Sequence, residues 1–275
     1  FPRSDRALAS VALWLIPAFL LGALGRWYDA GRIGRRGELA GQLGIVAAVA
    51  VLGLNAVNRV PVWFGFDVRE HMEYIDYIYT NGRLPLATQG FKMNEAPLFH
   101  LVSAIPYALL HARLDMDGNI LSMRYIPLLC GIAQAIIALR TLRLVFPGEA
   151  LAQFLGALVC GLLPMNIYLS LYPSNQPFVG VWSGLAVYFT LRHILDARDA
   201  RGWAGPILVG LCLGLATLSK VTGLLAAPGA MLGLAIAAAR RPDGRARAIA
   251  EPLVVLAILA IVSGWYFARN LIEAM

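Results

Sequence analysis

Long apolar segments are the feature that most limits what this sequence can fold into. Eight or nine can be placed, near residues 7–25, 39–57, 97–111, 122–145, 150–169, 177–195, 203–219, 221–239 and 252–268. A helix that crosses a bilayer needs about 20 apolar residues. Because the segments are continuous and do not alternate in ten-residue units, an outer-membrane barrel is excluded. The sequence predicts an all-α polytopic membrane protein, with residues 1–275 as a single transmembrane domain.

The charge of the chain fits this class. The net charge of +7 would indicate nucleic acid in a soluble protein, but here the arginines cluster between apolar segments, as the positive-inside bias predicts. We therefore expect contact with membrane lipid and not with nucleic acid. Cys130, Cys160 and Cys212 lie in apolar segments without paired spacing, so neither a disulfide framework nor a zinc site is indicated.

Arginine-rich loops predict the orientation. The loops "RRPDGRAR" (240–247), "RHILDARDAR" (192–201) and "RWYDAGRIGRR" (26–36) are expected on the cytoplasmic face. Lys220, "YPSNQP" (172–177) and the long loop at 58–96 then fall on the external face. Three apolar segments separate that loop from "YPSNQP", and an odd number cannot join two points on one side. The shortest segment, 97–111, is therefore expected to enter partway or lie tilted.

The loop at about 58–96 is too long and too aromatic for a simple connection. It contains "DVREHMEYIDYIY", which is typical of an amphipathic helix lying at the membrane interface. Aromatic side chains favour the headgroup level. The expected anchors are Trp63, Phe64, Phe66, Tyr74, Tyr77 and Tyr79.

Lys220 is the only formally charged residue between Trp203 and Ala239. An ionisable group in the hydrocarbon region costs about 2.5–3.5 kcal/mol on insertion scales and indicates a functional site. Because Lys220 falls at a segment end, its stem could instead lie in lipid while the ammonium reaches the headgroups. The functional alternative is a counter-ion for an anionic lipid group, most naturally a phosphate.

Asp67 and His71 stand four residues apart and share a helix face, with Glu70 beside them. A carboxylate held at the membrane boundary can act as a general base, although a solvated amphipathic helix has the same pattern. No pair of acidic residues has the spacing expected of metal ligands, so we expect that the protein does not require a metal. The remaining candidates are interpreted as structural. The stretch "LDMDGN" (114–119) is expected to form a loop with a turn at Gly118 and not a calcium loop. His100, His111 and His193 are scattered without metal-ligand spacing, and Gly210 and Gly214 are interpreted as a helix-packing pair.

Six stretches occur in order over about 210 residues: "FDVREHMEYIDYIYTNGRLP", "NEAPLFHLVSAIPY", "GNILSMRYIPLLCG", "YPSNQPFVGVW", "GLATLSKVTGLLAAPG" and "GWYFARN". Together they resemble the GT-C class of membrane glycosyltransferases. They are most similar to its polyprenyl-phosphate-dependent branch, which holds the aminoarabinose transferase of lipid A and the protein O-mannosyltransferases. Taken in the same order, the six stretches are similar to six features of that branch. These are its first external loop, its Pro-Pro-Leu-Tyr helix start, its Gly-Asn…Arg-Leu-Pro-Ser segment, its second external loop, its helix end with a lone lysine and its Trp…Arg-Asn stretch.

The resemblance implies a sugar donor linked to undecaprenyl or dolichyl phosphate, used on the non-cytoplasmic face, with no further cofactor. Asp67 would take the proton of the acceptor as it attacks and inverts the anomeric carbon. Lys220, with Arg269, would hold the departing phosphate. The other substrate-binding candidates are Glu70, His71, Asn175 and Gln176. The acceptor could be lipid A, another glycolipid, a polymer or a protein. The Ala-, Arg- and Gly-rich composition suggests a bacterium, so we expect the chain in the inner membrane. The non-cytoplasmic active face that the resemblance implies would then be periplasmic.

Three positions depart from the pattern of this branch. Val68 stands where the Glu of an Asp-Glu pair is usual, and Gln176 stands where an acidic residue is usual. Ala96 replaces the first proline of the Pro-Pro pair. They keep open an alternative, a catalytically silent relative that serves as an accessory subunit beside partner membrane subunits. A transporter using Lys220 is less favoured, because no internal repeat is visible. The chain stops at Met275, where members of the branch continue, so a further C-terminal region is expected.

Overall fold

The computed structural model describes residues 35–195, 202–241 and 244–274, and every regular element in these ranges is a helix. Within these ranges, four helices are long and apolar enough to cross a membrane, and shorter apolar helices accompany them. The prediction of an all-α polytopic membrane protein is confirmed. The segment predicted at 7–25 lies outside the described residues. Each of the other predicted apolar segments contains helix.

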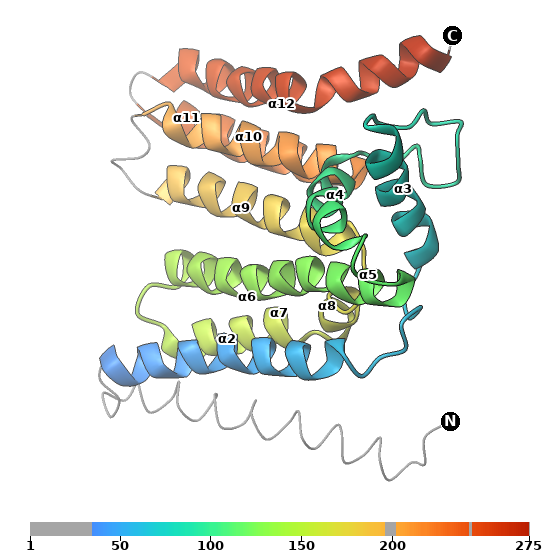
Figure 1. Ribbon diagram of the computed structural model, residues 1–275. Coiled ribbons are helices and arrows are strands. Elements are labelled where there is room, and N and C mark those ends of the chain that lie inside the picture. Colours follow the sequence, from blue (N-terminus) through green and yellow to red (C-terminus); the bar gives the residue numbers. More distant parts are fainter. Residues whose placement is uncertain (1–34, 196–201, 242–243, 275) are drawn as a thin grey trace.

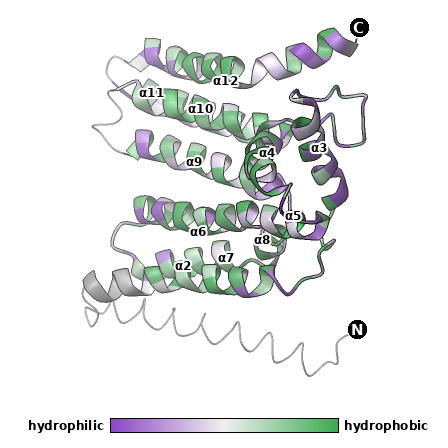
Figure 2. Ribbon diagram, in the orientation of Figure 1, coloured by the Kyte–Doolittle hydropathy of each residue, from purple (hydrophilic) through white to green (hydrophobic). Residues whose placement is uncertain are grey.

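In the described part of the chain, seven helices form a bundle (Figure 1). They are α2 (Arg35–Val57), α6 (Tyr125–Val145), α7 (Ala150–Leu162), α9 (Gln176–Leu195), α10 (Ala204–Ser219), α11 (Ala227–Ala239) and α12 (Gly244–Ala274). Figure 2 shows that hydrophobic residues dominate the bundle helices. We call one end of the bundle the cap end, where α3 (Val68–Asn81), α4 (Leu98–Leu110) and α5 (Met116–Met123) lie. The other end, where α6, α9 and α11 end and α7, α10 and α12 begin, is called the arginine end.

The third apolar segment, 97–111, lies beside α3 in the cap. His100, near the start of α4, hydrogen-bonds His71 of α3, and the Tyr107 hydroxyl, near the end of α4, donates to Asp76 of α3 at 2.8 Å. A 13-residue helix is only about 20 Å long, short of a hydrocarbon core of about 30 Å. With α4 in the cap, the long loop, "YPSNQP" and Lys220 all lie at the same end, as predicted.

The amphipathic helix predicted in the long loop is α3, but one of its expected headgroup anchors is buried. Trp63, Phe66 and Tyr79 are exposed, whereas Tyr74 has no exposed surface. Its ring stacks on His100 at 3.9 Å between ring centroids. The prediction for Tyr74 was wrong because α4 covers the face of α3 on which it lies.

Two local predictions are also corrected. The apolar segment 150–169 is not one helix: α7 ends at Leu162 and α8 (Pro164–Leu169) begins after it, because Pro164 has no N–H to continue the helix. The stretch "LDMDGN" is not a plain turn. It begins α5, where the Asp115 carboxylate caps the helix by accepting the Gly118 N–H at 2.8 Å.

At the arginine end, Glu251 of α12 is fully buried and tethers neighbouring elements. It contacts His193 Nε2 of α9 at 3.2 Å and Arg241 Nη1 at 3.0 Å. The structural interpretation of His193 therefore agrees with its position, far from the cap end.

Gly210 and Gly214 let α10 approach α12 closely. A Cβ atom at Gly210 would lie 2.9 Å from the backbone oxygen of Val255, and one at Gly214 would lie 2.7 Å from the Cβ of Val262. Small residues permit such contacts in membranes, where packing and not hydrophobicity drives helix association. The packing interpretation of this glycine pair is confirmed, and the contact fixes α12, whose cap-end residues reach the candidate site.

Gly210→Ala should destabilise the protein, because the added methyl group meets backbone that cannot move away. We expect a loss of about 1–3 kcal/mol, seen as a lower apparent melting temperature in detergent. Gly264→Ala is the matched control on α12, since a Cβ there meets nothing within 4 Å. It should be neutral or stabilising by about 0.5–1 kcal/mol. Equal effects of the two changes would contradict the close contact.

Candidate functional site

Arg124, at the start of α6, holds the loop that leads to Asp67. Its guanidinium is fully buried and donates to the carbonyl oxygens of Val57 at 2.8 Å, Val60 at 3.1 Å and Val62 at 2.6 Å, and to that of Pro61. No acidic residue in the described ranges pairs with it. The planar fork of an arginine suits several acceptors at once, so this one side chain fixes the path of the loop.

The same loop reaches Asp67 through unusual backbone. Gly65 has φ 122° and sits on the ring of Tyr172, which a Cβ atom would meet at 2.2 Å. Asp67 has φ 57°, and it is the one non-glycine residue in the described ranges with a positive φ. Aspartate tolerates this left-handed region better than most residues, and such conformations persist where the surroundings impose them. The loop thus presents Asp67 at the start of α3.

Asp67 belongs to a chain of alternating charges. Lys92 Nζ lies 2.9 Å from Asp67 Oδ2 and 2.8 Å from Glu95 Oε1. Partial burial lowers the pKa of the Lys92 ammonium, but hydrogen bonds to Glu95 and Asp67 outweigh burial and raise it above its usual value. Lys92 is therefore a cation at neutral pH that bridges two carboxylates.

Glu95 joins this chain of charges to the bundle. Its Oε2 accepts a hydrogen bond from Asn175 Nδ2 at 2.6 Å, and Lys220 Nζ lies 3.9 Å from its Oε1. Its backbone carbonyl accepts from the hydroxyls of Tyr266 at 2.7 Å and Tyr74 at 3.3 Å. One residue thus contacts α3, the loop before α9, the end of α10 and the cap end of α12.

Lys220 lies where α10 ends and η2 (Val221–Ala226) begins, with φ −161° and ψ 141°. Its side chain turns toward Glu95 and not outward along the lipid. Among the residues that the structure describes, its ammonium makes no hydrogen bond, because 3.9 Å exceeds hydrogen-bonding distance. Both lysines of the sequence, Lys92 and Lys220, therefore face one carboxylate, and Lys220 keeps donors for a further anion.

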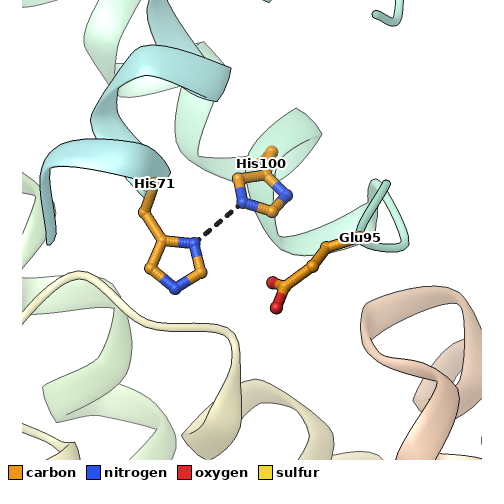
Figure 3. A group of neighbouring side chains, drawn as sticks. All are labelled: His71, Glu95 and His100. Carbon is orange, nitrogen blue, oxygen red and sulfur yellow. Dashed lines mark hydrogen bonds between the residues drawn. The ribbon is translucent and has the colours of Figure 1, made fainter. Parts of the chain in front are cut away.

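His71 and His100 form a buried pair beside these charges. His71 Nδ1 lies 3.0 Å from His100 Nε2, in hydrogen-bond contact. Burial lowers the pKa of His71 from 6.5 to about 4, so it is neutral at physiological pH. Figure 3 shows the Glu95 carboxylate beside the two imidazole rings. The possible ligand atoms of the three residues lie within 4.8 Å of one another.

The structure brings together four of the predicted site residues, Asp67, His71, Asn175 and Lys220, around Glu95. Arg269 lies further along α12 and donates to the carbonyls of Leu84 and Pro85, each at 3.1 Å. In the part of the chain that the structure describes, the side chains of Glu70 and Gln176 make no hydrogen bond or ion pair with this group. Gln176 instead begins α9, where its backbone N–H donates to Ser174 Oγ.

Sequence reasoning missed Lys92, Glu95, His100 and Tyr266. One signal was present, because Lys92 and Glu95 stand three residues apart immediately before an apolar segment, and Lys92 is one of only two lysines. His100 gave no signal, since its partner lies on another helix.

The family comparison bears on this geometry. The model of the family described as dolichyl-phosphate-mannose-protein mannosyltransferase matches residues 94–267, more than half of the chain. The chain belongs to this family. The predicted resemblance to GT-C glycosyltransferases is confirmed. The part that matches the mannosyltransferase family includes Glu95, Asn175, Lys220 and Tyr266, whereas Asp67 and Lys92 precede it. The comparisons with curated proteins and with solved structures found no match.

Arg124→Gln should loosen the loop before Asp67, because buried carbonyls lose a charged donor. We expect a loss of about 3 kcal/mol in the free energy of unfolding and faster hydrogen exchange in residues 57–66. Arg59→Gln, which changes an exposed arginine of the same loop, is the control and should leave both unchanged. Unaltered exchange in Arg124→Gln would contradict the anchoring role.

Proposed function

We propose that this chain transfers a sugar from a polyprenyl-phosphate donor to an acceptor at the cap end, with inversion at the anomeric carbon. The observation that carries the proposal is a row of four alternating charges formed by Asp67, Lys92, Glu95 and Lys220. The ion pair of Lys92 and Glu95 lies in the middle of the row. The carboxylate of Asp67 lies at one end, and the ammonium of Lys220, which has unused donors, lies at the other. Membership of the mannosyltransferase family supports a donor of this class.

Lys220 is the residue proposed to hold the donor phosphate. Its ammonium is partly buried, with 21% of the side chain exposed, and lies at the junction of α10 and η2. A fixed cation in a poorly solvated position stabilises the negative charge that develops on a leaving phosphate. Lys92 is already paired with two carboxylates, so its proposed role is to position Asp67 and Glu95.

Asp67 is proposed as the general base. Its side chain is 41% exposed, so an acceptor hydroxyl can reach it. As the hydroxyl oxygen bonds to the anomeric carbon, its proton passes to Asp67, and the bond between that carbon and the phosphate oxygen breaks. The electron pair leaves with the polyprenyl phosphate, beside Lys220. Proton acceptance by a positioned side chain contributes about 10²–10⁴-fold to a rate.

The cap end is proposed to face the periplasm of a bacterial inner membrane. The α11–α12 connection, at the arginine end, lies within "RRPDGRAR", and excess arginine near helix ends marks the cytoplasmic face. The aromatic side chains of Trp63 and Phe66 are exposed at the cap, and such side chains favour the membrane interface. The donor is undecaprenyl- or dolichyl-phosphate sugar, and the acceptor a glycolipid, a polymer or a protein.

The ion pair between Lys92 and Asp67 also favours the alternative, a catalytically silent relative that serves in an assembly with partner membrane subunits. Lys92 occupies Oδ2 of Asp67, and Val68, which replaces the usual Glu, is packed in the core with 3% exposure. A silent relative would show no transfer with any lipid-phosphate donor and would co-purify with other subunits.

Asp67→Asn should remove transfer activity while leaving the protein folded, because the amide cannot accept the proton. We expect kcat to fall about 10²–10⁴-fold, measured by sugar transfer in lipid nanodiscs. Glu73→Gln, at an exposed carboxylate of the same helix, should retain activity. Full transfer by Asp67→Asn would exclude Asp67 as the base.

Lys220→Met should weaken use of the donor, because the leaving phosphate loses its cation. We expect kcat/KM for the donor to fall about 10²-fold. Arg113→Met removes an exposed positive charge from the same end of the bundle and serves as the control. If both variants lose activity equally, net surface charge and not a phosphate contact explains the effect.

A further inference from the structure

We infer that His71, His100 and Glu95 form a binding site for one transition-metal ion of the Zn²⁺ type at the cap end. The inference goes beyond the proposed function and does not depend on it, because sugar transfer needs no step at this ion. The spacing of these residues along the chain gave no such indication, since the ligands come from α3, α4 and the loop between them.

The distances are close to those of a metal site. Zinc binds imidazole nitrogen at about 2.0–2.1 Å and carboxylate oxygen at about 2.0–2.2 Å, which places two tetrahedral ligand atoms roughly 3.4 Å apart. His71 Nδ1 and His100 Nε2 are 3.0 Å apart, and all three ligand atoms fit within 4.8 Å. Binding therefore requires the two rings to separate slightly and the Glu95 carboxylate to move in by roughly 1–1.5 Å.

The two imidazoles are already held in place. His71 is 3% exposed and His100 is fully buried. Phe99 packs edge-on against both rings, and Tyr74 stacks on His100. Ligands fixed by packing lose little freedom when an ion binds. Metal binding would replace the hydrogen bond between the rings, and its proton would move to the other nitrogen of the same ring.

Nearby charges decide which ions the site can take. When the ligand Glu95 is counted with Asp67, the two carboxylates balance Lys92 and Lys220, so the site offers no net negative charge to attract a hard cation. Mg²⁺ and Ca²⁺ prefer oxygen ligands, whereas neutral imidazole suits Zn²⁺, Cu²⁺, Ni²⁺ and Fe²⁺. Glu95 keeps lone pairs for an ion because each carboxylate oxygen has two. Three protein ligands also leave a fourth position open.

An ion here would join α3, α4 and the loop that carries Glu95. Asp67 directly precedes α3, four residues before His71, so the ion would fix the helix end that presents it. The expected role is the positioning of this end of the cap.

The test uses the full chain in detergent, with the affinity tag removed so that its histidines do not compete. The protein is equilibrated with Zn²⁺ alone, passed through a desalting column and analysed for zinc by mass spectrometry. We expect about one zinc per chain in the wild type and in His111→Gln, a control at a cap histidine outside the group. We expect less than about a tenth of that in His71→Gln and in His100→Gln.

Absence of zinc from the folded wild type would overturn the inference, as would full zinc retention by both histidine variants. A second measurement needs no variant. Co²⁺ bound to the wild type should give the strong visible absorption of a low-symmetry, nitrogen-ligated site. A spectrum like that of Co²⁺ in water would also overturn the inference.

Discussion

The carboxylate of Glu95 is the contact on which the arrangement of the cap end depends. It accepts hydrogen bonds from Lys92 and Asn175 and faces Lys220. The backbone carbonyl of the same residue accepts hydrogen bonds from two tyrosine hydroxyls. Charge-assisted hydrogen bonds are the strong ones in proteins, and removal of one partner from a buried pair leaves an uncompensated charge. Four separate parts of the chain therefore meet at one residue, Glu95, and Asp67 is held through Lys92.

This arrangement requires a rigid support, which the bundle supplies. The close contact of α10 with α12 at Gly210 and Gly214 fixes the helix whose Tyr266 reaches Glu95. From the other side, Arg124 holds four carbonyls of the loop before Asp67. The left-handed backbone at Asp67 is sustained between these supports. The candidate site is thus placed by packing within the bundle, while its reactive groups lie at the bundle's edge.

The sequence predicted what depends on local pattern and missed what depends on distant contacts. Continuous apolar segments predicted the bundle helices, the period of "DVREHMEYIDYIY" predicted α3, and the parity of crossings predicted that 97–111 does not span. The lone charge of Lys220 drew attention to the end of the bundle where the candidate site lies. The amphipathic pattern shows that one face of α3 is apolar, but it does not show whether lipid headgroups or another helix cover that face. Tyr74 was therefore expected at the headgroups, whereas it packs against α4. Nothing local showed that His100 meets His71, or that residues 92 and 220 face the same carboxylate. These are tertiary contacts between elements far apart in the chain.

The most direct measurement compares two lipids by native mass spectrometry of the purified chain: a polyprenyl phosphate and the polyprenol of the same length. If Lys220 and its neighbours recognise a lipid phosphate, one polyprenyl phosphate should bind per chain at concentrations where the polyprenol does not. Equal binding of the two lipids would show that the protein recognises only the hydrocarbon, and would contradict a phosphate site at the cap end.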